Sequence, residues 1–294
     1  QASPEHYIEP AVFLSQMNKG LFNSLSNAGM FITLSAASVD TRTGDFKFAN
    51  AGHTQGIIIR GCSGKNELLA STGIPLGIIQ DTSFKEKTGI LSPGDRFILY
   101  SDGITETQNS GEELFGEKRL IAVLNENISL APNEIIDNIL KALADFRGEA
   151  PPPDDISLII LQAKPRSISF SYPAVISSLD MMCQIVRESC IGCSSNFAYN
   201  MELAASEIFT NIINHSFCGQ KGDIRANLYI DGSKAVLDVF DTGKPFKMEN
   251  LPELDDTIPR EGSYGIQILR RICDTLDYTP LGPDGNHWHA TIKR

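Results

Sequence analysis

Apolar and polar positions in the first half of the chain predict a series of strands followed by helices. Strand patterns occur at residues 30–40, 46–51, 56–60, 83–90 and 95–101. The turn signals Thr41-Arg-Thr-Gly-Asp45 and Ser92-Pro-Gly-Asp95 separate neighbours in this series. Helical periodicity follows at 117–127 and 133–146, and one more apolar strand is predicted at 156–162. Strands with appended helices are typical of an α+β sandwich and not of a parallel βαβ array.

A second pattern begins after Lys164-Pro-Arg-Ser167, a short polar connector. Its predicted elements are a strand at 168–172, helices at 174–190 and 196–217, strands at 223–230 and 234–241, a helix at 264–276 and strands at 277–280 and 287–293. This order predicts a second α+β domain with helices on one face of a mixed sheet. We therefore expect one domain over residues 1–164 and another over residues 165–294.

Length and charge limit the classes of function. A chain of 294 residues is long enough for two separate cores, and its apolar runs are too short to span a bilayer. The net charge of −11 argues against nucleic acid as a partner, because phosphate neutralisation requires clustered Lys and Arg. A protein partner or a metal-bridged nucleotide fits this charge better.

The six cysteines are scattered and do not form the framework of a secreted disulfide-rich protein. With no charged-then-apolar signal peptide at the start, this usage predicts a cytoplasmic location. Cys190-Ile-Gly-Cys193 is a lone Cys-x-x-Cys motif without a second pair at zinc-finger spacing. We interpret both residues as structural thiols, and a metal or redox role is the alternative.

Polar residues in three places of the second domain together predict an ATP site. On a helix, Glu207, Asn211 and Asn214 fall within an arc of roughly 60°, although such a polar face can also be merely solvated. Asp241 ends an apolar strand, where a carboxylate can accept a hydrogen bond from an exocyclic amine, and Gly243 lets a flat base approach the backbone. After a loop of lid size, Gly262-Ser-Tyr-Gly265 begins a helix whose N-terminus can contact phosphates.

These motifs resemble those of the GHKL ATPase superfamily, and most closely its anti-sigma-factor serine kinases, over residues 168–294. The matching segments are Ser206-Glu207-Ile-Phe-Thr-Asn211, Asp241-Thr-Gly243-Lys-Pro-Phe and Gly262-Ser-Tyr-Gly265-Ile. The resemblance implies that Glu207 is the base that activates a substrate serine, that Asn211 ligates Mg²⁺ and that Asp241 holds adenine. It implies that Gly262 and Gly265 cover the triphosphate. Arg260 is either a phosphate contact or a solvated lid residue, and His215 resembles a histidine with a structural role.

The serine-kinase branch is favoured over the histidine kinases by what precedes the motifs. No helical hairpin with a phospho-acceptor histidine lies before residue 168, and His6 has no such setting. The lid is short, and no further domain follows as it does in gyrase-type relatives. The expected activity is therefore phosphorylation of a serine.

Acidic residues at strand ends predict a second, metal-binding site in the first domain. Asp102 follows one buried strand, and Asp154-Asp155 precedes another. Two strand-terminal acids brought together would offer the oxygen ligands that Mg²⁺ or Mn²⁺ prefers. Each acid alone is also typical of a turn or a helix cap.

The succession of motifs around these acids resembles the metal-dependent PPM protein serine/threonine phosphatases, in their bacterial sporulation-stage-II-E branch. The matching segments are Met30-Phe-Ile-Thr-Leu, Phe48-Ala-Asn-Ala-Gly-His53, Thr72-Gly-Ile-Pro-Leu-Gly77, Leu99-Tyr-Ser-Asp-Gly-Ile-Thr-Glu106, Phe115-Gly-Glu-Lys-Arg-Leu120 and Asp154-Asp-Ile-Ser157. By this resemblance Asp102 and Asp154 bind the two-metal centre, with Asp155 as the adjacent alternative. Gly52 and His53 are interpreted as determinants of the fold.

The same resemblance places the family's first metal-binding acid before residue 1. We therefore expect this chain to be a fragment of a longer protein, with an incomplete phosphatase domain and an upstream sensory or receiver domain.

Together the two resemblances imply a bacterial partner-switching regulator. Its kinase would phosphorylate a STAS-type anti-sigma-factor antagonist, its phosphatase would remove that phosphate, and a sigma factor and a second copy of the chain are further partners. One alternative is an ATP-gated protein-binding module without kinase turnover. Another is a phosphatase whose degenerate ATPase domain serves as a scaffold.

Overall fold

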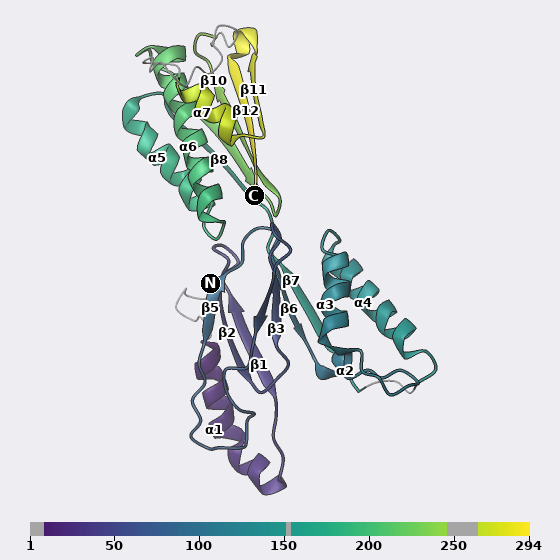
Figure 1. Ribbon diagram of the computed structural model, residues 1–294. Helices are drawn as coiled ribbons and strands as arrows, with labels where there is room; N and C mark the ends of the chain where they lie inside the picture. The colour runs from purple at the N-terminus through teal and green to yellow at the C-terminus, as the bar shows by residue number, and fades with distance from the viewer. Residues whose placement is uncertain (1–8, 151–153, 246–263) are drawn as a thin grey trace, which may run out of the picture. The chain divides into compact units, whose positions relative to one another are not determined.

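The computed structural model describes residues 9–150, 154–245 and 264–294 (Figure 1). The chain divides into two units, Gln1–Ala163 and Lys164–Arg294. The lid residues of the predicted ATP site, which include Arg260 and Gly262, lie outside the described residues.

The first unit contains two antiparallel sheets. One has the order β1-β2-β5, formed by β1 (Leu34–Val39), β2 (Asp45–Ala51) and β5 (Lys87–Ile90). The other has the order β4-β3-β6-β7, formed by β4 (Asn66–Leu69), β3 (Gly56–Ile59), β6 (Arg96–Tyr100) and β7 (Leu158–Gln162). The strand β4 is absent from the sequence prediction because its four residues show no clear alternation of apolar and polar positions.

Alternating side chains on these strands face different cores, and this alternation stacks the unit in layers. Phe46 and Phe48 of β2 share a core with Phe97 of β6, so this core lies between the two sheets. Ala49 and Ala51 of β2 point the other way, into a core with the helix α1 (Pro10–Ala28).

The second sheet packs its outer face on three helices, α2 (Asp102–Thr105), α3 (Gly116–Glu126) and α4 (Pro132–Arg147). Ile57 and Ile98 of the sheet share a core with residues of all three helices. Figure 1 shows α1 on one side of this unit and α3 and α4 on the other. The predicted sandwich with flanking helices is therefore confirmed.

The second unit is a five-stranded sheet of order β11-β12-β10-β9-β8. Its strands are β8 (Arg166–Pro173), β9 (Asp223–Ile230), β10 (Lys234–Asp241), β11 (Thr275–Pro280) and β12 (Asn286–Lys293). Inward residues of these strands, among them Ile224, Leu237 and Trp288, form one core with the helices α5 (Ile176–Ser189), α6 (Ser195–Asn211) and α7 (Tyr264–Ile272). Figure 1 shows the three helices on one face of the sheet, as the sequence predicts.

The α+β class is confirmed, but the sheet of the second unit differs from the predicted mixed sheet. All of its strand pairs between described residues are antiparallel. The two helices α5 and α6 return the chain to the end at which β8 stops, so β9 runs antiparallel to β8. The strands β10 and β11 run in the same direction, but β12 lies between them and no parallel pair forms.

Several element bounds also differ from the sequence prediction. The helix predicted at 264–276 ends at Ile272, because Thr275–Pro280 pairs with β12 and alternates its side chains like a strand. The helix predicted at 196–217 is α-helical only to Asn211 and continues as a π-helix over Ile212–Phe217. The short helix α2 after β6 is a further element that apolar periodicity does not reveal.

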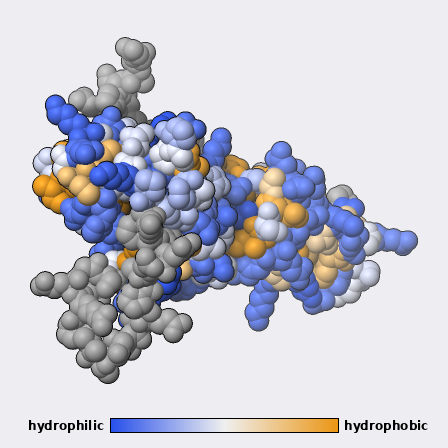
Figure 2. Space-filling model, turned by 90° about the horizontal axis from the view of Figure 1, so that it is seen from above, coloured by the Kyte–Doolittle hydropathy of each residue, from blue (hydrophilic) through white to orange (hydrophobic). Residues whose placement is uncertain are grey.

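No helix in the described part of the chain combines the length and the apolar character that crossing a membrane requires. On the face shown in Figure 2, hydrophilic residues predominate and hydrophobic residues form small patches.

Candidate functional site

The helix α6 presents two of the predicted site residues on one face. It begins after Ser194, whose side chain accepts a hydrogen bond from the N–H of Phe197 (3.3 Å). Its apolar residues, such as Ile208 and Phe209, are fully buried against the sheet. Glu207 and Asn211 are partly exposed and one turn apart, so both side chains lie along the same edge of the helix.

The π-helix after Asn211 changes which residues continue that edge. A π turn contains more residues than an α turn, so the angular positions after Asn211 shift. Asn214 and His215 are exposed, whereas Ser216 is buried. The predicted arc therefore holds for Glu207 and Asn211 but does not extend regularly to Asn214.

The start of α7 lies against this polar edge. A Cβ atom placed on Gly265 would overlap the Glu207 carboxylate and would lie 3.7 Å from Nδ2 of Asn211. The structure thus brings together three predicted residues from segments more than 50 residues apart: Glu207, Asn211 and Gly265. Because a side chain at position 265 would fill the space beside both polar groups, glycine keeps that space open.

Asn211 offers a ligand position in this space. Its Nδ2 atom is buried and has no hydrogen-bond partner among the described residues. A 180° rotation of the amide exchanges its oxygen and nitrogen, so the same place can hold a metal-ligating oxygen. An unpartnered buried amide is costly without a ligand, and the Asn211 side chain therefore fits the Mg²⁺ that accompanies ATP.

Asp241 lies at the end of β10 and is 2% exposed. Its Oδ1 atom accepts hydrogen bonds from the N–H of Gly243 (2.8 Å) and from Nδ2 of Asn286 (2.8 Å). Its Oδ2 atom is buried and has no partner in the described part of the chain. Burial raises the pKa of the Asp241 carboxyl, and the hydrogen bonds from Asn286 and Gly243 oppose that rise.

The free oxygen of Asp241 fits the predicted contact with adenine. A buried acceptor that no protein donor satisfies can be satisfied by the exocyclic amine of a bound base. Besides the predicted approach of a base, Gly243 has a packing role, because a Cβ on it would lie 2.7 Å from the backbone of Ser216. Gly243 therefore permits close packing of the β10 end against the π-helix, and Lys244 N–H donates to the Ser216 carbonyl (2.8 Å).

The residues that hold Asp241 in place were not among those predicted from the sequence. Asn286 is fully buried, donates to Asp241 and also donates to the carbonyl of Gly243 (3.0 Å). Its own Oδ1 accepts a hydrogen bond from the hydroxyl of Tyr278 (2.9 Å). Asn286 pairs in register with Asp241 across β10 and β12. This pairing identifies Asn286 as a support of Asp241, and it cannot be predicted from the sequence alone.

In the first unit, the structure places the backbone of Asp154 and Asp155 beside the start of α2. A Cβ on Gly103 would lie 2.6 Å from the Asp155 carbonyl oxygen and 2.9 Å from that of Asp154. The Ser101 hydroxyl donates to the Asp155 carbonyl (3.1 Å) and accepts from the N–H of Ser157 (2.8 Å). Asp102, which lies between Ser101 and Gly103, is therefore close to the backbone of both predicted acids.

The carboxylates of these three residues, Asp102, Asp154 and Asp155, are exposed. Among the described residues they do not join a group of three ligand atoms within 4.8 Å of one another. The carboxylate donors fit Mn²⁺ or Mg²⁺ in chemical type, but the described residues do not assemble them into a set of three ligands.

The backbone of Gly52 and His53 forms a tight turn that packs against Pro75 and is hydrogen-bonded to Asn50. Gly52 has a positive φ of 71°, and a Cβ on it would collide with the ring of Pro75. The buried Asn50 accepts from the N–H of His53 (2.7 Å) and donates to the carbonyls of His53 and Thr54. These contacts agree with the interpretation of Gly52 and His53 as determinants of the fold.

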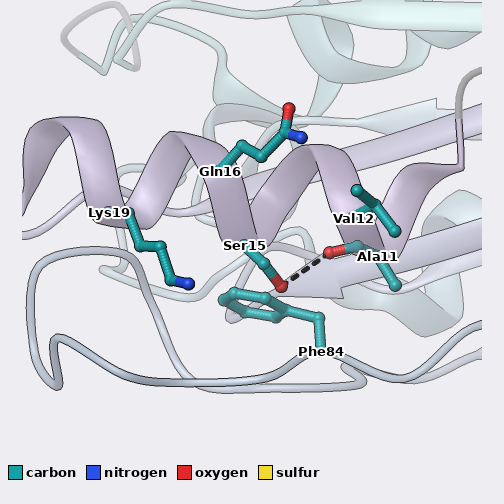
Figure 3. Close-up of a pocket in the computed structure, with 6 residues that line it drawn as sticks. All are labelled: Ala11, Val12, Ser15, Gln16, Lys19 and Phe84. Atoms are coloured by element: carbon teal, nitrogen blue, oxygen red, sulfur yellow. Dashed lines mark hydrogen bonds between the residues drawn. The ribbon is translucent and has the colours of Figure 1, made fainter.

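The first unit also contains a pocket against α1, which Figure 3 shows with its lining residues drawn as sticks. Five of its residues come from one face of the helix, and the Phe84 ring faces them from a loop. Among the described residues, Lys19 is the only charged one that lines this pocket, and none of them supplies a carboxylate for a divalent metal. The candidate metal residues lie on other elements.

Cys190 and Cys193 form a turn in which the N–H of Cys193 donates to the carbonyl of Cys190 (3.0 Å). Burial raises the pKa of the Cys190 thiol to about 12. Neither thiol joins a group of three potential metal ligands among the residues that the structure describes. The predicted structural role fits these surroundings.

Comparison with known proteins extends these observations. Residues 1–164, more than half of the chain, match the family "Stage II sporulation protein E (SpoIIE)". The chain belongs to the SpoIIE family. Residues 172–292 match the family "Histidine kinase-like ATPase domain". The predicted succession of a SpoIIE-type phosphatase domain and an ATPase domain is therefore confirmed.

Two curated relatives are similar to parts of the chain. Protein IcfG of Synechocystis sp. is 33% identical over 130 residues, which cover 44% of this SpoIIE-family chain and 20% of IcfG. The phosphoserine phosphatase RsbU of Bacillus subtilis is 32% identical over 166 residues, which cover 55% of this chain and 47% of RsbU. The chain thus spans less than half the length of each relative.

The solved structures that are similar to this chain include proteins from Mycobacterium tuberculosis and Pseudomonas aeruginosa. The RsbU and RsbW domains of a Mycobacterium tuberculosis protein cover 95% of this SpoIIE-family chain, which covers 73% of theirs, at 19% identity and a TM-score of 0.40. The SiaA-PP2C domain of Pseudomonas aeruginosa covers 52% of this chain, which covers 61% of that domain, at 22% identity and a TM-score of 0.47.

Proposed function

We propose that this chain is a partner-switching regulator in which a protein serine kinase opposes a metal-dependent phosphoserine phosphatase. The observation that carries the kinase half is the buried, unpartnered Oδ2 of Asp241. A second group without a partner among the described residues, Nδ2 of Asn211, lies beside Glu207 and Gly265. The two free groups suit the two ends of an ATP molecule, its adenine and its magnesium-bound phosphates.

In the kinase half, each side chain has one task. Asp241 accepts a hydrogen bond from the adenine amine and so fixes the base, while Asn211 holds the Mg²⁺ that accompanies the phosphates. Bound ATP would supply the phosphoryl group and leave as ADP, and its Mg²⁺ would neutralise negative charge that develops on the phosphates. Glu207 accepts the proton of the substrate serine hydroxyl as that oxygen attacks the γ-phosphorus. The predicted cover by Gly262 and a contact from Arg260 remain part of this proposal.

In the phosphatase half, Asp102 and Asp154 hold divalent cations, Mn²⁺ or Mg²⁺, with Asp155 as the adjacent alternative. These cations supply an activated water that hydrolyses phosphoserine. Support comes from the membership of the SpoIIE family, from the contact of Gly103 with the backbone of residues 154 and 155, and from the similarity to RsbU, which is named a phosphoserine phosphatase.

The proposed substrate is a STAS-type anti-sigma-factor antagonist, which the kinase phosphorylates and the phosphatase dephosphorylates. A sigma factor that the ATPase unit sequesters and a second copy of this chain are the other proposed partners. Opposing activities in one protein would let an upstream signal set the phosphorylation state of the antagonist.

The test is transfer of labelled γ-phosphate from ATP to a purified STAS-domain protein of the same organism. Glu207→Gln should lower the transfer rate by about 10²- to 10⁴-fold, because a positioned general base contributes that much, and should leave ATP binding intact. The matched control is Glu202→Gln on the same helix, since Glu202 instead forms an ion pair with Arg187. The control variant should transfer phosphate at the wild-type rate.

Three outcomes would contradict parts of this proposal. Transfer that survives Glu207→Gln would show that another group is the base. If the wild type never transfers phosphate but binds the partner more tightly with ATP, the unit is an ATP-gated binding module. If the wild type does not bind ATP at all, the unit is a scaffold for the phosphatase.

A further inference from the structure

The face of the second sheet opposite the helices carries two histidines and an aspartate close together. His287 and His289 are two residues apart on β12, so their side chains project from the same face. Trp288, which lies between them, points the other way into the core. Asp238 of β10 pairs in register with His289, and the side chains of all three residues are 26–35% exposed.

The three side chains converge on one point. Oδ1 of Asp238 lies 2.7 Å from Nε2 of His287 and 2.8 Å from Nδ1 of His289. One ligand atom from each residue lies within 4.8 Å of the other two, and this is the only group of three His, Cys, Asp or Glu residues to do so in the described part of the chain. Tetrahedral coordination at zinc distances places ligand atoms about 3.4 Å apart, so small side-chain rotations are enough to admit an ion.

Neighbouring side chains hold the two imidazoles in orientations suited to a metal. The ring of Phe240 stacks on His287, with centroids 4.4 Å apart and planes 4° from parallel. The hydroxyl of Thr291 lies 3.3 Å from Nε2 of His289, the ring nitrogen that does not face Asp238. When Thr291 accepts the proton of Nε2, Nδ1 carries the lone pair that ligates metal, which is the usual outer-shell arrangement of a metal-bound histidine.

We propose that Asp238, His287 and His289 form a Zn²⁺ site on the outer face of the ATPase-type sheet. Two imidazoles and one carboxylate are a typical donor set for zinc, with a fourth position open to water or to a partner's side chain. Imidazole donors make the site distinct from the oxygen-rich sites expected for Mg²⁺ and Mn²⁺. It is also distinct from the candidate ATP site, because Asn286 next to His287 points to the opposite face and binds Asp241.

The site would clamp β10 to β12 at the end where Asp241 lies. Asp238 and Asp241 belong to one strand, and His287 and Asn286 are consecutive on the other. A bound ion therefore crosslinks, on the outer face, the same two strands that the Asn286–Asp241 hydrogen bond joins on the inner face.

The experiment measures zinc binding to the chain without an affinity tag, after metal removal with a chelator. Competition with a chromophoric zinc chelator should give one tightly bound Zn²⁺ per chain, and Co²⁺ in its place should give the visible absorption of tetrahedral coordination. His287→Gln and His289→Gln should each lower zinc affinity by about 100-fold or more, because loss of even an outer-shell partner costs 10- to 100-fold. Asp238→Asn tests the carboxylate without changing its size.

Two controls separate this site from other thiol or imidazole donors. His53→Gln, in the first unit, and the pair Cys190→Ser with Cys193→Ser should leave both stoichiometry and affinity unchanged. Trp288 is the only tryptophan of the chain and lies between the two histidines, so unchanged fluorescence shows that each variant keeps its sheet. Absence of tight zinc binding in the wild type would overturn the proposal, and so would equal zinc binding in a folded His287→Gln/His289→Gln variant. Asp238 would then only form hydrogen bonds with the two histidines.

Discussion

Nδ2 of Asn286 donates a 2.8 Å hydrogen bond to Oδ1 of Asp241 across the ends of β12 and β10. The same amide donates to the carbonyl of Gly243 and accepts from the hydroxyl of Tyr278. Asp241 is therefore held through one oxygen, and its other oxygen is left for a ligand. A residue outside the recognised motifs thus positions the carboxylate that the motifs identify.

Asn286→Ala should weaken ATP binding although Asn286 has no predicted contact with the nucleotide. Its removal deprives Asp241, Gly243 and Tyr278 of a buried hydrogen-bond partner, which should lower the free energy of unfolding by about 1–3 kcal/mol. Isothermal titration with ATP and urea unfolding measure the two effects. Asn227→Ala, on the exposed face of β9, is the control and should change neither.

The raised pKa of Asp241 predicts the direction of a pH dependence. Because the folded-state pKa lies above the unfolded one, the contribution of Asp241 to stability is largest below the unfolded pKa and is lost as the pH rises through the folded pKa. Asp241→Asn removes this pH-dependent contribution, so the free energy of unfolding of the variant, relative to that of the wild type, should increase with pH. Urea unfolding of both proteins from acid to neutral pH measures the difference, and a decrease with pH would contradict the assignment.

The same Asp241→Asn variant should bind ATP about 10- to 100-fold more weakly, because a hydrogen bond to a charged acceptor is worth about 1.5–3 kcal/mol. An amide nitrogen in place of Oδ2 would face the adenine amine with a second donor. A variant that is more stable at neutral pH and yet binds ATP less well would separate the ligand-binding role of Asp241 from any structural one. Unchanged ATP affinity would show that the base binds elsewhere.

Gly265→Ala should abolish phosphate transfer, because the new methyl group would overlap the Glu207 carboxylate and approach Asn211. The rate of transfer from labelled ATP is the measurement, with circular dichroism as a check of folding. Gly20→Ala is the matched control: Gly20 also lies in a helix, but a Cβ on it meets no atom within 4 Å. That change should leave transfer unaffected and stabilise α1 by about 0.5–1 kcal/mol.

Gly103→Ala tests the link between the predicted metal ligands of the first unit. Its Cβ would lie within 3 Å of the carbonyls of Asp154 and Asp155, which are backbone atoms and can yield only if the loop moves. The loop should shift away from Asp102, and Mn²⁺ affinity measured by titration should fall by at least about tenfold, since the site depends on ligand geometry. Equal Mn²⁺ affinity in a folded variant would separate Asp154 and Asp155 from the metal site.

Thiol labelling distinguishes the cysteines by their surroundings. Burial raises the pKa of Cys190 to about 12 and that of Cys273 to about 11, so at neutral pH the reactive thiolate of each is a minute fraction. Cys62 and Cys218 are exposed and should react with a maleimide first, whereas Cys190 should react only after unfolding. Mass spectrometry of labelled peptides gives the order, and early labelling of Cys190 would favour the redox alternative.

Local pattern was enough to predict most strands and helices. The strands at 223–230 and 234–241 have the predicted bounds because each alternates apolar and polar residues without interruption. The end of α7 could not be predicted, since Thr275–Pro280 becomes a strand through its pairing with β12. The prediction of a mixed sheet was wrong for a similar reason. The order of the strands depends on the insertion of β12 between β10 and β11, and no local property of the sequence predicts this insertion.

For the candidate site, residue type and spacing identified Glu207, Asn211 and Asp241 but not their supports. Asn286 reaches Asp241 because β12 pairs with β10 in a particular register, and Ser216 reaches Gly243 because the π-helix turns it toward the end of β10. Both arrangements arise from tertiary contacts. The Asp238–His287–His289 cluster was likewise hidden, since the two histidines are close in sequence but the aspartate is 49 residues from His287. Short motifs locate the residues that contact ligands, and pairing between strands determines which others orient them.

The π-helix at Ile212–Phe217 makes the number of residues in this segment important, in addition to the identity of its buried side chains. Deleting one residue would allow a regular α-helix through position 217, which is a more favourable conformation locally. It would also rotate every later side chain by about 100°, so Ser216 would leave the backbone of Gly243 and the end of β10 would lose its neighbour. In sequences that share this architecture, insertions and deletions between positions 212 and 217 should therefore be rare.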